Sequence, residues 1–468
     1  MDTASQKPKA MAGIKKNSRD LTIGTPWKKI VLFALPMLIG NIFQQLYNII
    51  DAIILGRFVG STALAASGTA FPIIFLMVSL FMGIAMGSTI LIAQYFGAKD
   101  SENMRKVAGT TYVFLFVGSI LITIMGLTMS EGILHWLNTP ADVFDQAKIF
   151  LDITFLGSIS MFGYNTISGI LRGIGNSKTP LYFLIIATFV NIALVMLFVI
   201  GFDWGVAGAA FATFAAQTVS FIISIVYINK HNPELGIKWQ NLVFDFTVFK
   251  NIIAIGIPTG LQQMTVSIGL LLIQSMINSY GSDVLAGFTA ASRIDSFAFM
   301  PIMSFSAAVS TFVGQNIGAQ KMYRIEVGTK SSIKISVLYS IFSAALLLLL
   351  ATPLLGLFDE NPAAIAAGHD YLVRIVPFYF IIAVTFCYNG LMRGAGAAVV
   401  PLIVTIFSMI LVRVPLAYIL SQYMNSPNGI WWSVSIGWLM GLVIVYTYYK
   451  KGKWRGKSVI DKTKPQSI

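Results

Sequence analysis

One acidic residue interrupts an apolar run near the start of the chain. Asp51 lies within LYNIIDAIILGRF and follows Asn41, Gln44 and Asn48 at positions i, i+3, i+7 and i+10. On a helix these four side chains share an arc of about 80°. A carboxylate inside an apolar helix is costly and marks a functional site by default. It can exchange a proton when it is removed from water, or it can hold a hard monovalent cation such as Na⁺ beside other oxygen ligands.

A structural role for Asp51 is the alternative. Asp51 follows Lys29 by 22 residues, which places it in the outer half of a helix that crosses a membrane. There it could be solvated at the interface, near Arg57. We favour the functional interpretation because Asp51 continues the polar stripe.

Two further predicted helices carry polar stripes. The helix at 205–229 has Thr213, Gln217, Ser220 and Ser224 on one face, and the helix at 249–278 has Gln263, Ser267, Gln274 and Asn278. Single residues of this kind often join neighbouring helices. Lipid cannot satisfy their amides, so three aligned stripes favour a polar cavity. The candidate substrate-path residues are Asn41, Gln44, Asn48, Asn165, Gln217, Gln263 and Ser267.

Four other charges lie inside predicted helices. Asp295 and Arg293 are candidates for gating, although residues two apart on a helix do not face each other. Lys148 and Asp152 have the spacing of a structural ion pair. Arg374 and Arg413 are isolated basic residues, for which a structural role is expected.

No motif of a soluble enzyme is present. GILRGIGNSKTP lacks the βαβ context of a dinucleotide site, and no P-loop sequence occurs. His135, His231 and His369 lack metal-site spacing, and Cys387 is the single cysteine. We therefore predict a protein that is not an enzyme and has no cofactor, with no metal beyond a Na⁺ at Asp51.

The elements that position these residues are membrane helices. Mean hydropathy is +0.77 and 11% of the residues are charged, against about 25% in soluble domains. A helix needs about 20 residues to cross the bilayer. The sequence predicts an all-α protein with twelve spans, at 28–55, 62–94, 107–129, 146–171, 181–200, 205–229, 249–278, 284–315, 329–351, 363–390, 399–421 and 428–449.

The basic residues indicate the orientation of these spans. With the N-terminus in the cytoplasm, the inner segments hold 27 of the 32 Lys and Arg, as the positive-inside rule requires. The predicted outer loops are acidic; they contain Glu131, Asp142, Asp203, Asp283, Asp359 and Glu360. The net charge of +13 therefore reflects membrane orientation, with both termini cytoplasmic, and no nucleic-acid partner is expected.

The chain is duplicated. QYFGA at 94–98 recurs as QNIGA at 315–319, and RGIG at 172–175 recurs as RGAG at 393–396, each 221 residues later. Six spans per half give two lobes related by a pseudo-twofold axis along the membrane normal, a plan of secondary transporters; a duplicated channel or scaffold is the alternative. The predicted segments are a tail at 1–27, a lobe at 28–229, a linker at 230–248, a lobe at 249–449 and a basic tail at 450–468.

These motifs resemble the multidrug and toxic compound extrusion (MATE) family of prokaryotes. LPMLIGNIFQQLYNIIDAIILGRFVGSTALAA resembles its first span, and AASRIDSFAFMPIMSFSAAVSTFVGQNIGA its eighth. The resemblance implies efflux of cationic, amphipathic drugs against H⁺ or Na⁺. It also implies that Asp51, Asn191 and Thr213 form the cation-coupling site. Val195 stands where the family pattern has a second acid, and Gln262–Thr265 lacks a glutamate found in another branch.

The resulting prediction is a monomeric antiporter in the bacterial cytoplasmic membrane. It would work by alternating access between the two lobes, with drug-like small molecules and membrane lipid as partners. A flippase for lipid-linked oligosaccharides or lipids is the alternative, weakened because the spans offer only Arg293, Arg374 and Arg413 for a pyrophosphate. A channel, or an enzyme within the membrane, is the third hypothesis.

Overall fold

The computed structural model describes residues 20–137, 139–358, 360–458 and 460. Most of the predicted N-terminal tail, the end of the C-terminal tail and Asp359 lie outside these residues. Within them no β-strand occurs, so the all-α prediction is confirmed. The helices are α1 (Pro26–Ile54), α2 (Ser61–Gly97), α3 (Ser101–Trp136), α4 (Ala141–Leu156), α5 (Ser158–Gly173), α6 (Lys178–Val195), α7 (Gly205–His231), α8 (Phe246–Asn278), α9 (Ser282–Gly318), α10 (Met322–Leu355), α11 (Pro362–Ile375), α12 (Tyr379–Gly394), α13 (Val399–Thr405), α14 (Val414–Met424) and α15 (Asn428–Lys450).

Short helical turns of other types join several of these helices. The π-helical turns Leu55–Val59, Met196–Gly201 and Ile406–Arg413 extend α1, α6 and α13. A 3₁₀ turn at Val376–Phe378 joins α11 to α12. Two further 3₁₀ turns, Trp239–Asn241 and Lys453–Gly456, lie in the segment between α7 and α8 and after α15.

Eleven helical segments of the described chain are long and apolar enough to cross a membrane. The twelfth predicted span, 146–171, corresponds to α4 and α5, which follow each other with a break at Gly157. Several helices start earlier than predicted, because an aspartate caps the first turn instead of ending the helix. Asp100 accepts a hydrogen bond from Asn103 N at 3.0 Å, and Asp245 accepts one from Val248 N at 3.0 Å.

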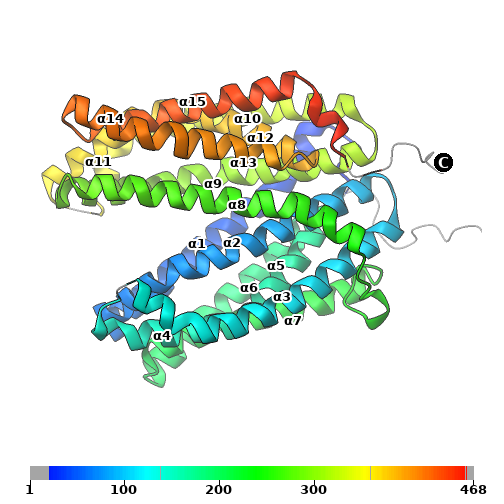
Figure 1. Cartoon of the computed structure of the whole chain (residues 1–468), viewed down its shortest axis with the longest axis horizontal. Coiled ribbons are helices and arrows are strands. Elements are labelled where there is room, and N and C mark those ends of the chain that lie inside the picture. The colour runs from blue at the N-terminus through cyan, green and yellow to red at the C-terminus, as the bar shows by residue number, and fades with distance from the viewer. Residues whose placement is uncertain (1–19, 138, 359, 459, 461–468) are drawn as a thin grey trace, which may run out of the picture.

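The helices form two six-span groups, which we call the N lobe (α1–α7) and the C lobe (α8–α15) (Figure 1). Their turns repeat at the sequence offset. Positive φ angles pair Gly60 (117°) with Gly281 (96°) and Gly175 (84°) with Gly396 (86°). The Gly157 break in the N lobe likewise has its counterpart at Phe378, the last residue of the 3₁₀ turn between α11 and α12. The structure thus confirms the duplication, while the exact domain boundaries stay predictions.

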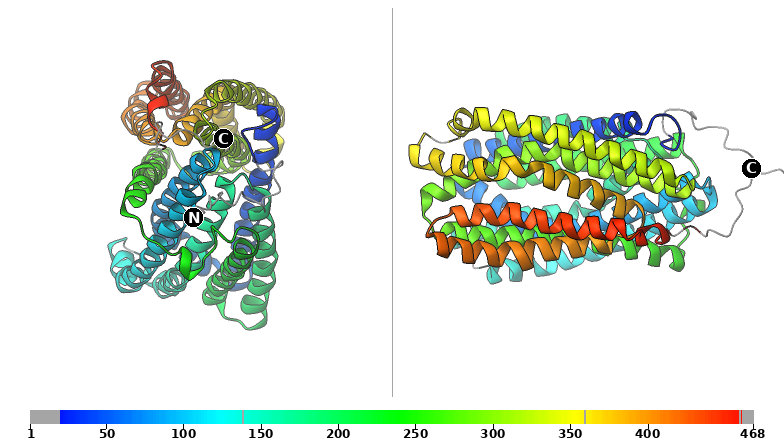
Figure 2. Two further views of the ribbon diagram at one scale, coloured as in Figure 1. Left: turned by 90° about the vertical axis from the view of Figure 1, so that its right-hand side faces the viewer. Right: turned by 90° about the horizontal axis from the view of Figure 1, so that it is seen from above.

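Both ends of the described chain lie at one end of the bundle, which we call the termini end (Figures 1 and 2). The ribbons of the two lobes converge toward this end and diverge toward the other (Figure 1). Helices α2 and α8 cross between the lobes at four glycines. A Cβ atom on Gly83 would come within 2.4 Å of Gly256 O, and one on Gly87 within 2.5 Å of Ile252 O. Backbones therefore touch directly, as small residues permit in membrane helices.

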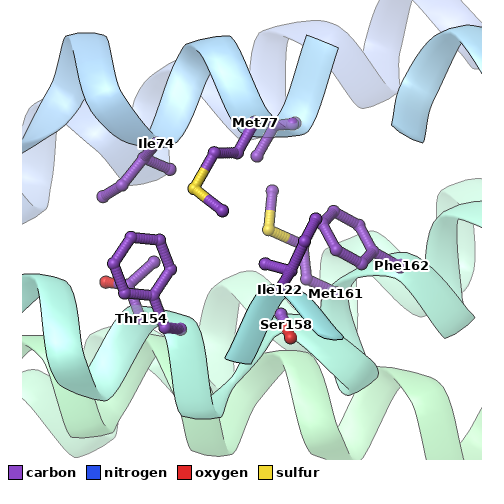
Figure 3. Close-up of a pocket in the computed structure, with 9 residues that line it drawn as sticks. Ile74, Met77, Ile122, Thr154, Ser158, Met161 and Phe162 are labelled. Carbon is purple, nitrogen blue, oxygen red and sulfur yellow. The ribbon is translucent and has the colours of Figure 1, made fainter. Parts of the chain in front are cut away.

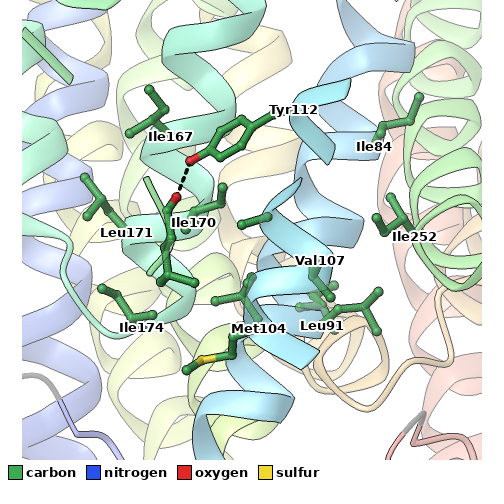
Figure 4. Packing of buried hydrophobic residues seen from close by; sticks show 14 of the residues in the cluster. Ile84, Leu91, Met104, Val107, Tyr112, Ile167, Ile170, Leu171, Ile174 and Ile252 are labelled. Atoms are coloured by element: carbon green, nitrogen blue, oxygen red, sulfur yellow. Dashed lines mark hydrogen bonds between the residues drawn. The ribbon is translucent and has the colours of Figure 1, made fainter. Parts of the chain in front are cut away.

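The N-lobe core continues into the connection between the lobes. Residues of α2, α3 and α5 pack with Ile252 of α8 in one cluster of buried side chains (Figure 4). Within this cluster the Tyr112 hydroxyl donates to Leu235 O at 2.9 Å. This bond ties the segment between α7 and α8 to α3, so the linker is packed against the N lobe.

Candidate functional site

Three N-lobe helices bring four polar side chains together around Thr213. The Thr213 hydroxyl, on α7, donates to the Asp51 carboxylate of α1 at 3.5 Å. It accepts hydrogen bonds from Tyr47 Oη at 3.3 Å and from Asn191 Nδ2 of α6 at 3.4 Å. Hydroxyl hydrogen bonds are commonly 2.7–2.8 Å long. The cluster is therefore loosely packed around its centre.

The hydrogen-bonding capacity of this cluster is not balanced. A threonine hydroxyl has one donor and two acceptor positions, and Thr213 uses all three. Asp51 Oδ1 and Asn191 Oδ1 are buried, and neither has a hydrogen-bond partner in the described part of the chain. Asn191 also lies beside the Asp51 carboxylate. Both orphaned oxygens are acceptors, so a cation or a proton satisfies them and another acceptor does not.

No resident cation balances Asp51. The ion pairs among the described residues do not include it, and Arg57 is exposed. On the side where the family resemblance implies a second acid, Val195 is 0% exposed and packs with Ile54, Leu55 and Val199. The site therefore has one carboxylate, bordered by apolar packing.

A small polar cavity adjoins this cluster. It is lined by Gln44 and Tyr47 of α1, Thr188 of α6 and Gln217 of α7, with Leu184, Ala187 and Ala216. The buried Oε1 atom of Gln217 has no partner among the described residues. Tyr47 faces both the cavity and Thr213, so it connects the two. The structure thus brings together Gln44 and Gln217, which the sequence placed on separate stripes.

The other substrate-path candidates are dispersed. Asn41 Nδ2 donates to Ser304 Oγ of the C lobe at 3.1 Å, so this residue joins the lobes. Asn48 and Gln263 are exposed, and Ser267 donates to its own helix at Gln263 O. Asn165 donates to Met161 O within α5. These four residues do not share a site with Asp51.

A second cavity lies at the break between α4 and α5 (Figure 3). Ile74 and Met77 of α2 face Thr154, Met161 and Phe162 across it. The broken backbone is satisfied by hydroxyls, since Thr123 Oγ1 donates to Phe155 O at 2.8 Å. Thioether and aromatic side chains of this kind adapt to apolar ligands of varied shape.

The C lobe contains its own buried carboxylate. Asp295 of α9 is 5% exposed and accepts hydrogen bonds from Tyr371 Oη at 2.6 Å and from Tyr379 Oη. The guanidinium of Arg413 interacts electrostatically with it. Arg293 is exposed and has no part in this cluster. The two gating candidates are therefore separated.

Two other charged pairs are local. Lys148 and Asp152 form the predicted ion pair at 2.9 Å, and Ser130 also donates to Asp152. Arg374 pairs with Asp370 one turn earlier, at 2.9 Å. Both pairs follow from helical spacing and are structural.

Sequence reasoning missed four residues of these clusters. Tyr47 lies four residues before Asp51 and on its face, so helical spacing could have included it. Tyr371, Tyr379 and Arg413 reach Asp295 from distant parts of the chain, and no local pattern indicates that contact.

Comparison with known proteins gives the family. A family model described as MatE matches residues 36–197 and again 258–419. The chain belongs to the MatE family. It is 32% identical to "Probable multidrug resistance protein YpnP" of Bacillus subtilis (strain 168), over 93% of this chain and 97% of the relative. It is 25% identical to "Probable multidrug resistance protein NorM" of Thermotoga maritima, over 94% and 96%.

Solved structures of MATE transporters have the same fold. "Outward-facing conformation of a multidrug resistance MATE family transporter of the MOP superfamily" has a TM-score of 0.88 and 25% identity, over 93% of this chain and 98% of that one. The same values hold for "Reverse polarity of binding pocket suggests different function of a MOP superfamily transporter from Pyrococcus furiosus Vc1 (DSM3638)". This MATE chain is therefore a multi-pass membrane transporter, with the MatE pattern once in each lobe.

Proposed function

We propose that this MATE transporter is an antiporter, which exports cationic, amphipathic compounds in exchange for H⁺ or Na⁺. The orphaned oxygens of Asp51 and Asn191 carry the proposal. They form a site with one negative charge, no resident cation and more acceptors than donors. A transported cation meets that need.

Both coupling ions fit this site in chemical terms. A proton on Asp51 would turn one carboxylate oxygen into a donor toward Asn191 Oδ1. A Na⁺ ion would be held by oxygens of Asp51, Asn191 and Thr213, which are ligands suited to a hard cation. Since Val195 supplies no second acid, one positive charge per cycle is the expected load of the N lobe.

The drug would occupy the N lobe beside this site. The polar cavity at Gln44 and Gln217 adjoins the cluster through Tyr47, and the cavity at Met77 and Met161 offers apolar contacts. An amphipathic cation needs both kinds of contact. Ion binding at Asp51 changes the charge and the hydrogen bonds at Tyr47, and would in this way weaken drug binding.

We place the termini end in the cytoplasm, because most Lys and Arg lie in the segments at that end. The lobes converge there and diverge at the other end (Figure 1). In this arrangement the transporter would be open to the outside, and rocking of the lobes would expose the site to the cytoplasm.

Reconstituted protein tests the proposal. Purified wild type and Asp51→Asn are placed in liposomes, and transport of a cationic ethidium-type dye is followed under a Na⁺ gradient and, separately, a pH gradient. We expect one gradient to drive dye movement in the wild type, with at least a tenfold loss in Asp51→Asn. Asp152→Asn is the matched control, because Asp152 already has a lysine partner.

The other results are also informative. Movement that is unchanged in Asp51→Asn would contradict the coupling site. No movement under either gradient would contradict drug antiport and favour a lipid substrate.

A further inference from the structure

Two glutamines that mark the sequence repeat meet between the lobes at the termini end. Gln94 lies near the end of α2 in the N lobe, and Gln315 lies at the equivalent place in α9 of the C lobe. Both are 0% exposed. The antiport chemistry at Asp51 gives neither residue a role.

Each glutamine donates a hydrogen bond to the other lobe. Gln94 Nε2 donates to Gly394 O, at the end of α12, at 2.9 Å. Gln315 Nε2 donates to Gly173 O, at the end of α5, at 2.9 Å. Gly173 and Gly394 are separated by the same 221 residues as the glutamines. The two bonds are therefore symmetric copies that both join the N lobe to the C lobe.

The backbones of α2 and α9 touch at the same place. A Cβ atom on Gly97 would come within 1.9 Å of Gln315 O, and one on Gly318 within 1.8 Å of Gln94 O. This contact leaves no room for any side chain at either glycine. It explains why glycine recurs three residues after each glutamine.

The segment before α1 covers one of the two glutamines. Leu21 N donates to Gln315 Oε1 at 2.9 Å. Lys321 and Arg324 of the C lobe hold this segment through the carbonyls of Thr22 and Gly24, at 3.0 and 2.8 Å. The segment thus binds the C lobe before the chain enters the N lobe at α1.

The segment after α15 covers the other glutamine. Ser458 Oγ donates to Gln94 Oε1 at 3.3 Å. Trp454 is buried, and Arg455 pairs with Glu326 of α10 at 2.6 Å, so this segment is anchored on the C lobe. Each glutamine amide therefore donates to the opposite lobe and accepts from one of the two segments.

We propose that Gln94 and Gln315 form a twofold latch that holds the lobes together at the termini end. The segments 21–25 and 453–458 act as straps, which orient the two amides and strengthen the latch. Opening this end breaks both bonds and leaves their donors and carbonyls unpaired until water enters. The shared glycine contact makes the two bonds break together. The inference relies on the proposed rocking of the lobes, but its test measures distances and requires no transport.

Paired spin labels measure the opening directly. Lys178→Cys with Val399→Cys reports on the termini end, and Asp142→Cys with Ala363→Cys reports on the opposite end, both in a Cys387→Ser background. All four labelled positions are exposed. Distance distributions are recorded by pulsed electron paramagnetic resonance in lipid nanodiscs. The wild type is expected to show mainly a short distance at the termini end.

Loss of a latch bond should shift this population. We expect Gln94→Ala or Gln315→Ala to raise the ratio of open to closed termini ends about fivefold, and the double variant about 25-fold. The opposite end should close in parallel. Gln240→Ala, at an exposed glutamine of the linker, is the matched control and should leave both distributions unchanged.

A milder variant keeps the test decisive if the alanine variants do not fold. Ser458→Ala removes only the strap contact to Gln94, at a half-buried surface position, and should shift the ratio by up to about fivefold. Glutamine variants with wild-type distributions at both ends would overturn the latch. A Ser458→Ala distribution identical to wild type would overturn the role of the strap. Failure of dye antiport, with these shifts intact, would contradict the proposed function and leave the latch in place.

Discussion

Each lobe of this MATE transporter contains one aspartate within a membrane helix, and the two have opposite surroundings. Asp295 has two tyrosine donors and a buried arginine. Asp51 has one long hydrogen bond from Thr213, an orphaned second oxygen and no cationic side chain beside it. The C-lobe carboxylate is therefore complete within the protein, whereas the N-lobe carboxylate needs something from solution.

This contrast shows how a duplicated scaffold can divide its work. The two lobes keep the same turns and the same glutamines, because these residues hold the lobes together. The acids occupy unrelated positions, on α1 and on α9, and were added to each lobe separately. The sequence repeat describes the frame, and the departures from it indicate the chemistry.

The largest expected effect separates the two acids by stability. Arg413→Leu leaves Asp295 buried without its cation, and removal of one partner from a buried pair costs about 3–5 kcal/mol in the free energy of unfolding. Asp51→Asn removes no ion pair and should change that free energy by less than about 1 kcal/mol. Unfolding in mixed micelles measures both values.

A double variant checks this explanation. Asp295→Asn with Arg413→Leu removes both charges and should recover part of the lost stability. The comparison would be wrong if Asp51→Asn destabilised the protein as much as Arg413→Leu does.

An added acid should make the N-lobe site bind more than one ion. Val195 is buried one helical turn after Asn191 and borders the Asp51 cluster. In Val195→Asp we expect the dependence of dye export on ion concentration to steepen, with the Hill coefficient rising from about 1 to about 2. Initial rates in liposomes, over a range of Na⁺ or H⁺ concentrations, measure this.

Val195→Asn is the matched control, since it adds a polar side chain of similar size without a charge. If Val195→Asp and Val195→Asn gave the same ion dependence, a single charge would not set the stoichiometry.

The smallest expected effect concerns the contact between ion and drug. Tyr47→Phe removes one donor to Thr213 and should weaken ion binding about fivefold, because one hydrogen bond contributes about 1 kcal/mol. The ion concentration at half-maximal export measures the change. Tyr280→Phe removes a similar hydroxyl contact in the C lobe, to Ser421 O at 3.3 Å, and should leave that concentration unchanged. Equal shifts in the two variants would show that Tyr47 acts only on stability.

Much of the fold follows from the sequence. Apolar runs must become helices in a membrane, since a backbone in lipid has to satisfy its own hydrogen bonds. The constant offset then places equivalent turns in both halves, as the paired φ angles of Gly175 and Gly396 show. Helix ends were predicted less well, because charged first turns capped by Asp100 and Asp245 continue the helix beyond the apolar run.

The site was accessible to sequence reasoning only in part. The stripe on α1 identified Asp51, and the family resemblance supplied Asn191 and Thr213. Asn41 lies on the same stripe but contacts Ser304 of the other lobe. Periodicity gives the face of a helix but not its neighbours along that face, so residues of one stripe can have different surroundings.

The sequence by itself determined the membrane class, the twelve spans, the duplication and the position of Asp51, because these depend on local hydropathy and on identity at a fixed offset. Only the tertiary structure decided which polar groups are satisfied. Asp295 meets Tyr371 and Tyr379 across 76 and 84 residues, and Gln94 meets Gly394 across 300. Whether a buried oxygen has a donor depends on which helices pack around it, and that packing is a property of the whole chain.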